Sequence, residues 1–274
     1  MKVKKYLPSL MTLTNLFLGF LSILYVQRGD ISLGCYLILI AAILDSFDGK
    51  LARKIGIASE FGKEIDSLAD LISFCLAPSF IIFNIFYSFD QLVPEFIFIY
   101  LAVISSLPVL MGSIRLARFN VGHSQESKQS HFIGLPSPMS AIAICSIVLL
   151  KIKVDNDQNM NEIFLFDSKN LGFLDINIIL PIIILLSFLM IGKIQFSKFP
   201  LLSFSYSKNN SIRLLILIIG ILVLCISALY DYFHIGLFLF SSYYIVSNII
   251  FHFINNSIQL NQLRKKLKNK KSKK

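Results

Sequence analysis

The chain has 274 residues, of which 55% are apolar and 15% are charged, whereas an ordinary soluble domain is about 45–50% apolar and about 25% charged. This composition excludes an ordinary soluble globular protein, and the mean hydropathy of +0.71 indicates long apolar runs. The net charge of +10 does not indicate a nucleic-acid-binding protein, because eight of the 26 basic residues lie in the last eleven positions.

Apolar runs long enough to cross a bilayer, about 20 residues each, predict eight transmembrane helices. In chain order they cover residues 7–26, 32–52, 66–89, 95–119, 136–154, 173–194, 212–230 and 233–254. The sequence therefore predicts an all-α integral membrane protein. Its membrane-embedded domain is expected over residues 1–260, and the basic tail, residues 261–274, is expected to be disordered.

The distribution of Lys and Arg predicts the orientation of these spans. An even number of spans puts both termini on one side, and 22 of the 26 basic residues fall on that side. Because cytoplasmic loops carry an excess of Lys and Arg, we expect both termini in the cytoplasm and the protein in the cytoplasmic membrane. The basic tail would also attract anionic lipid headgroups.

Four aspartates lie near the ends of the second and third predicted spans. Asp45 and Asp48 are three residues apart at the end of the second span, and Asp66 and Asp70 are four apart at the start of the third. Each spacing puts both side chains on one face of a helix. The short connection makes the two helices antiparallel neighbours, so all four carboxylates can converge at the cytoplasmic edge of the membrane.

Grouped carboxylates repel one another, and in a membrane they are costly unless cations lie between them. Carboxylates without His or Cys are hard oxygen ligands, which suit Mg²⁺, Mn²⁺ or Ca²⁺ better than zinc. Two such cations would bind a phosphate or diphosphate and stabilise an in-line displacement. The structural alternative is that the acids pair with Arg53, Lys54 and Lys63, but pairing does not explain four acids at helical spacing on two adjoining spans.

This region resembles the complete signature of the CDP-alcohol phosphatidyltransferases, in the pattern Asp45-x2-Asp48-Gly49-x2-Ala52-Arg53-x8-Gly62-x3-Asp66-x3-Asp70. Members of that family are membrane enzymes, generally dimeric, that move a phosphatidyl or similar group from a CDP-linked lipid to an alcohol. The resemblance implies a homodimer and two divalent cations, Mg²⁺ or Mn²⁺ with Ca²⁺ as another occupant. It further implies that the cations are held by Asp45, Asp48, Asp66 and Asp70, and that Asp70 is also the general base.

Three further segments are similar to the phosphatidylserine synthase branch of the family: Thr12-x2-Asn15, Arg115-x2-Arg118-x-Asn120 and Gly134-x-Pro136-Ser137-Pro138. They imply CDP-diacylglycerol and L-serine as substrates and CMP as a product. The residues expected to bind the CDP-lipid are Thr12, Asn15, Asp48, Gly49, Ala52, Arg53 and Gly62. The candidate residues for binding serine or phosphate are Lys63, Glu64, Arg115, Arg118, Asn120, Pro136 and Ser137.

Some of these residues have a structural alternative. Thr12 and Asn15 could be polar residues that pack helices together, and Arg115 and Arg118 could be positive-inside residues that extend to the membrane surface. For the whole protein, one alternative is the same chemistry with another acceptor, glycerol 3-phosphate or inositol phosphate, or with an archaeal-type ether lipid. A cation transporter is the other, but it predicts a related second half, and residues 136–254 contain no matching constellation of acids.

Overall fold

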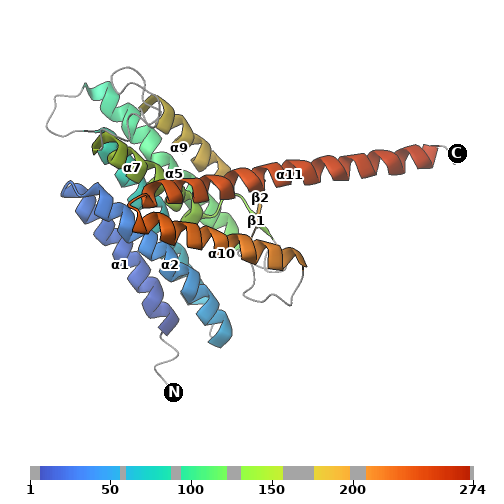
Figure 1. The fold of residues 1–274 in the computed structure, drawn as a ribbon, viewed down its shortest axis with the longest axis horizontal. Coiled ribbons are helices and arrows are strands. Elements are labelled where there is room, and N and C mark those ends of the chain that lie inside the picture. The colour runs from blue at the N-terminus through green and yellow to red at the C-terminus, as the bar shows by residue number, and fades with distance from the viewer. Residues whose placement is uncertain are drawn as a thin grey trace.

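The computed structural model describes residues 7–55, 60–87, 94–121, 131–156, 176–197 and 208–271. A helix forms at each predicted span (Figure 1). The helices are α1 (Leu7–Gln27), α2 (Ile31–Ile55), α3 (Glu60–Leu71), the π-helical turn η2 (Ile72–Leu76), α4 (Ala77–Phe86), α5 (Glu95–Val121), α7 (Ser137–Asn156), α9 (Ile176–Ile191), α10 (Lys208–Leu229) and α11 (Phe233–Lys271). The third predicted span is the continuous helix formed by α3, η2 and α4.

Length and hydropathy identify membrane spans among these helices. Within the described residues, five stretches are long and apolar enough to cross a membrane: Leu10–Gln27, Glu60–Phe86, Glu95–Val121, Ser137–Asp155 and Phe233–Ile254. Shorter apolar helices occupy the other three predicted spans, at Ile31–Phe47, Asn177–Ile191 and Leu214–Leu229. The predicted all-α membrane fold is therefore confirmed, and the side on which the termini lie stays a prediction.

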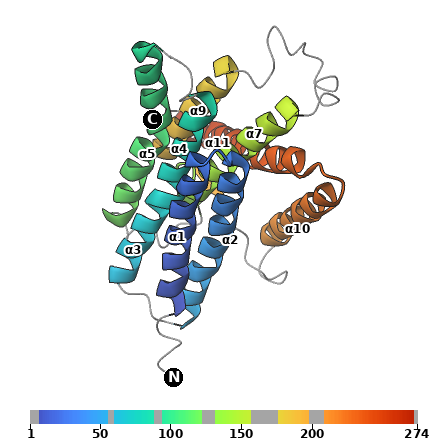
Figure 2. The same cartoon turned by 90° about the vertical axis from the view of Figure 1, so that its left-hand side faces the viewer.

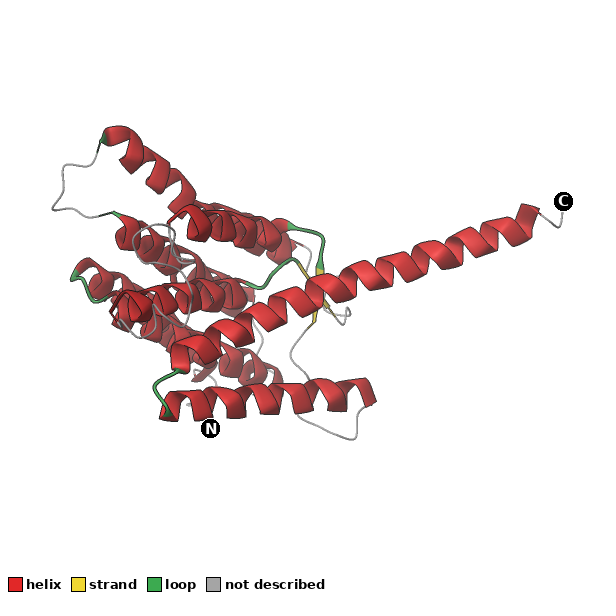
Figure 3. Cartoon of the chain, turned by 45° about the horizontal axis from the view of Figure 1, so that its top comes forward, coloured by secondary structure: helices red, strands yellow, loops and turns green. Residues whose placement is uncertain are grey.

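Two features differ from the sequence prediction. A short antiparallel ribbon pairs β1 (His131–Ile133) with β2 (Gln195–Ser197), so that Phe132 lies opposite Phe196, and Figure 3 shows this ribbon beside α11. The basic tail is the end of α11, which continues as a helix to Lys271, where we had expected disorder. Lys, Leu, Arg and Gln are good helix formers, and the preceding span has already nucleated the helix.

Helix α7 lies at the centre of the fold and is the most buried of the five long spans. It packs against α2, α4, α9 and α11. Small buried residues such as Ala141, Ala143 and Cys145 line it, and they let helices approach closely where lipid supplies no hydrophobic driving force. The Ser146 hydroxyl is hydrogen-bonded to the Ser241 hydroxyl of α11 at 3.1 Å.

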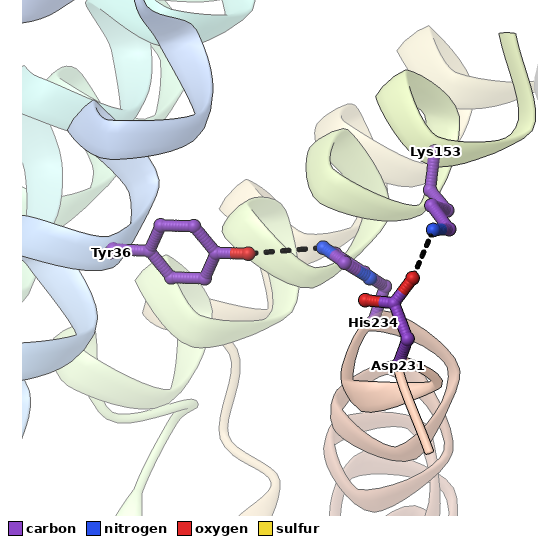
Figure 4. A network of polar contacts seen from close by, with 4 residues as sticks. All are labelled: Tyr36, Lys153, Asp231 and His234. Carbon is purple, nitrogen blue, oxygen red and sulfur yellow. Dashed lines mark hydrogen bonds and ion pairs between the residues drawn. The ribbon is translucent and has the colours of Figure 1, made fainter. Parts of the chain in front are cut away.

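Polar contacts join α2 and α7 to the α10–α11 turn and the start of α11 (Figure 4). The Tyr36 hydroxyl lies 3.0 Å from His234 Nε2, and Lys153 forms an ion pair with Asp231. The hydrogen bond from Lys153, together with its charge, lowers the pKa of Asp231. These contacts hold the α10–α11 turn against the two inner helices.

Candidate active site

Three aspartates from two helices meet in a half-buried cluster. Asp45 lies on α2, and Asp66 and Asp70 lie on α3, with one carboxylate oxygen of each within 4.8 Å of the others. Helix α1 packs against both α2 and α3, and Figure 2 shows it between them. The three acids lie close together, as predicted. The main neighbour of both α2 and α3, however, is α1, whereas the sequence predicted that these two helices would be neighbours of each other.

The donor set of this cluster fits a divalent cation. Three carboxylates this close repel one another unless a positive charge lies between them, and hard oxygen ligands suit Mg²⁺, Mn²⁺ or Ca²⁺. The backbone of the fourth predicted ligand, Asp48, lies one turn beyond Asp45 in α2. Its side chain lies outside the described residues, as do those of Ala52 and Arg53, and the surroundings of Gly49 are likewise not described.

Asn15 is a buried polar residue of α1, the helix that packs against both α2 and α3. Its side chain is 0% exposed, and among the described residues neither amide atom of that side chain has a hydrogen-bond partner. Its backbone carbonyl accepts a 2.8 Å hydrogen bond from the Ser73 hydroxyl, three residues beyond Asp70. Thr12, one turn earlier on α1, is also buried. Because native structures rarely leave a buried amide unsatisfied, Asn15 fits a residue that binds a ligand.

The π-helical turn η2 begins two residues after Asp70 and packs closely against glycines of α1 and α5. A Cβ on Gly19 of α1 would lie 2.3 Å from Ser73 Oγ, and one on Gly112 of α5 would lie 2.3 Å from Cys75 Sγ. Neither position has space for a larger side chain. Since π-helical turns often occur at functional sites, we interpret this close packing as the support that positions Asp70 against α1 and α5.

Hydrogen bonds join α3 to the end of α5 beside the aspartates. The Ser67 hydroxyl donates to Asn120 Oδ1 at 3.1 Å, and Asn120 Nδ2 donates to Glu64 Oε2 at 3.3 Å. Two of the candidate residues, Glu64 and Asn120, are therefore brought together near Asp70. Ser67 was not among the predicted site residues, although its position three residues from both Glu64 and Asp70 puts it on the same side of α3.

Arg115 of α5 reaches the start of α7. Its Nη1 donates a 2.9 Å hydrogen bond to the hydroxyl of Ser137, the first residue of α7, which is fully buried. The Ser140 hydroxyl, three residues further along α7, is also buried and has no hydrogen-bond partner among the described residues. A helix N-terminus carries a partial positive charge, so Arg115 and α7 together favour an anion.

The remaining candidates have other surroundings. Arg118 is exposed and donates to the backbone oxygen of Ile191 at 3.1 Å, where a cation favourably caps the C-terminus of α9. Lys63 is exposed on α3, and Gly62 before it is half-buried. Pro136 is buried, and its carbonyl accepts from the Ser140 backbone N–H. This contact gives Arg118 a role in helix capping that the sequence did not predict, and its part in binding serine or phosphate stays a prediction.

The loop before α7 is attached to the end of α9. Gly134 has φ +80°, and a Cβ there would lie 2.2 Å from the Met190 backbone oxygen. The Gly134 backbone N–H donates to the Ile194 carbonyl at 2.8 Å, and that of Leu135 donates to the Leu189 carbonyl at 2.9 Å. These contacts require glycine at position 134 and hold the N-terminus of α7 in place beside Arg115.

Comparison with known proteins gives consistent findings. Residues 5–168 match the family model described as CDP-alcohol phosphatidyltransferase. The chain is 36% identical, over 70% of its length and 72% of the relative, to the CDP-diacylglycerol–serine O-phosphatidyltransferase of Helicobacter pylori strain J99. It is 32% identical, over 78% of its length and 86% of the relative, to the protein of the same name from Methanocaldococcus jannaschii. An archaetidylserine synthase from Methanothermobacter thermautotrophicus is 38% identical over 52% of this chain and 58% of that relative.

Proposed function

The chain belongs to the CDP-alcohol phosphatidyltransferase family, and from this premise we propose that it transfers a phosphatidyl group from CDP-diacylglycerol to the hydroxyl of L-serine. CMP is the second product. The observation that carries the proposal is the carboxylate cluster of Asp45, Asp66 and Asp70 in a chain whose relatives are named for transfer to serine.

The metal requirement follows from the family and from the cluster. Asp45, Asp48, Asp66 and Asp70 would hold two divalent cations, Mg²⁺ or Mn²⁺, which when bound neutralise charge on the diphosphate. Chelation by EDTA is expected to abolish CMP release, and added Mn²⁺ or Mg²⁺ is expected to restore it. Full activity after chelation would contradict the proposed metal dependence.

The chain's own residues supply the proton transfer and the binding of the donor. Asp70 accepts the proton of the serine hydroxyl, the serine oxygen forms a bond to the phosphorus that carries the lipid, and the bond from that phosphorus to CMP breaks. Asn15, with its buried and unsatisfied amide, is suited to hydrogen-bond the cytidine or its phosphates. A hydrogen bond to such a ligand would remove the cost of about 1–3 kcal/mol of leaving a buried polar group unpaired.

Replacement of Asp70 tests the proposed base. We expect Asp70→Asn, assayed for CMP release in detergent with Mn²⁺, to lose activity by about 10²- to 10⁴-fold, the usual contribution of general acid–base catalysis. Glu95→Gln is the matched control, because Glu95 is an exposed carboxylate at the far end of α5 and its replacement should leave CMP release unchanged. Turnover of Asp70→Asn close to wild type would remove Asp70 from this role.

A competition among L-serine, glycerol 3-phosphate and inositol phosphate tests the acceptor. The lipid product should carry serine alone, and a glycerophosphate product would assign the chain to another branch of the family. The similarity to an archaetidylserine synthase favours a second candidate donor, a CDP-linked ether lipid. Offering both donors in equal amounts identifies the preferred one.

We also propose that the protein is a homodimer in the cytoplasmic membrane, with the carboxylate cluster at the cytoplasmic face. The orientation is supported by the 22 of 26 basic residues that fall on the side of the termini, and the dimer is supported by the family resemblance. Protease added to inside-out vesicles should remove the C-terminal end of α11. Removal in right-side-out vesicles would refute the orientation, and cross-linking that captures only monomers would refute the dimer.

A further inference from the structure

We propose that the acceptor is bound through both of its charged groups, with the serine carboxylate at Arg115 and the serine ammonium at Glu64, so that the hydroxyl faces Asp70. This inference rests on the proposed function and adds to it how the substrate is oriented. Hydrogen bonds at the α3–α5 and α5–α7 contacts carry it, and it brings in Ser67 and Ser140, which were not among the predicted site residues.

The first subsite consists of the side chains of Ser67, Asn120 and Glu64, which together contain several hydrogen-bond acceptors. Asn120 takes a hydrogen bond from Ser67 and gives one to Glu64, which holds the three groups together. Glu64 Oε1 and the remaining lone pairs of Asn120 Oδ1 and Ser67 Oγ still offer acceptor sites. A carboxylate among neutral oxygens favours a cation and repels a phosphate, so this subsite suits the ammonium group of an amino acid.

Arg115, Ser137 and Ser140 form the second subsite, which has the opposite polarity. The Arg115 guanidinium donates to Ser137, and Ser140 lies three residues further along the same face of α7. The Ser140 hydroxyl is 1% exposed and, within the described residues, unpartnered. The guanidinium, this hydroxyl and the positive end of α7 all favour an anion, and a carboxylate is the anion that an amino acid offers.

Both subsites include a residue from the same end of α5. Arg115 and Asn120 are five residues apart on α5, which is about 7.5 Å along the helix axis. The two charged groups of serine are separated by one carbon atom, so they can reach side chains that extend from neighbouring turns of one helix. Asp70 lies one turn from Ser67 on α3. Three separate contacts to one chiral centre require a single configuration, so the site should accept L-serine and reject D-serine.

Glu64→Gln tests the ammonium subsite in the full-length protein. Loss of one charged hydrogen bond, about 1.5–3 kcal/mol, should raise KM for L-serine about 10- to 100-fold while kcat and KM for CDP-diacylglycerol stay unchanged. With 3-hydroxypropionate, which lacks the ammonium group, the variant and the wild type should have equal kcat/KM. Glu60→Gln, one turn earlier on the same helix and also exposed, is the matched control and should behave as wild type with both acceptors.

Arg115→Gln tests the carboxylate subsite with ethanolamine, which lacks the carboxylate. The variant should lose kcat/KM for L-serine and keep the wild-type value for ethanolamine. A rise in KM for CDP-diacylglycerol instead would assign Arg115 to the donor phosphates and overturn the proposed orientation.

The outcomes separate this inference from the proposed function. If the wild type forms no serine-containing lipid, the proposed function fails. If it forms that lipid, but Glu64→Gln keeps the wild-type KM for L-serine or D-serine reacts as well as L-serine, the proposed function stands and the orientation is wrong.

Discussion

Replacing Gly19 with Ala tests whether close packing of α1 on the π-helical turn positions the catalytic residues. The added Cβ would lie 2.3 Å from Ser73 Oγ and 2.6 Å from Ser73 Cα. Because the second of these is a backbone atom, a rotation of the Ser73 side chain does not relieve the crowding. Helix α1 and η2 must move apart by about 1 Å, which is expected to cost about 1–3 kcal/mol, the usual range for overpacking.

The same movement would stretch the 2.8 Å hydrogen bond from Ser73 to the Asn15 carbonyl and shift Asn15 relative to Asp70. A misplacement of about 1 Å can reduce turnover about 100-fold, so kcat should fall much more than the protein is destabilised. The apparent melting temperature in detergent should fall by roughly 2–12 °C, at about 2–4 °C for each kcal/mol.

Thermal unfolding and CMP release are measured on the same preparation. Gly192→Ala is the matched control, because a Cβ at Gly192 would meet its nearest atoms at 3.4, 3.6 and 3.8 Å, which are ordinary contacts. This control should melt and turn over like the wild type. If Gly19→Ala also keeps both the wild-type melting temperature and the wild-type kcat, the proposed support of Asp70 by α1 is refuted.

Three further predictions concern single side chains. Asn15→Leu should raise the melting temperature, because it removes a buried unsatisfied amide. It should also raise KM for CDP-diacylglycerol. A less stable variant with unchanged KM would contradict the ligand-binding role of Asn15. Arg118→Gln should lower the melting temperature without changing KM for L-serine, because Arg118 bonds to Ile191; a raised KM would return it to the acceptor site. Lys153 lowers the pKa of Asp231. Their ion pair therefore stabilises the fold at pH values above the ordinary carboxyl pKa, and this stabilisation is lost as the pH falls through the lowered pKa of Asp231. The stability advantage of wild type over Asp231→Asn should therefore be present at neutral pH and absent in strong acid, and an advantage independent of pH would refute the ion pair as its cause.

The positions of the spans and the carboxylate cluster follow from local sequence patterns. In lipid each helix must satisfy its own backbone hydrogen bonds, so the positions of spans follow from local apolar runs, and a helix forms at each of the eight. The convergence of Asp45, Asp66 and Asp70 followed from helical spacing at the facing ends of two consecutive spans. Both inferences needed only residues close together in the chain.

The pairing of polar side chains across helices depends on how the helices pack in three dimensions. Ser67 and Asn120 are 53 positions apart, and Arg118 and Ile191 are 73 apart, so no local pattern shows that the first pair lies beside Asp70 or that the second caps α9. The close approach of Gly19 to Ser73 and the ribbon between β1 and β2 likewise depend on how distant segments pack. The physical reason is that helical periodicity determines which residues share a face, whereas the identity of the facing helix depends on the packing of the whole bundle.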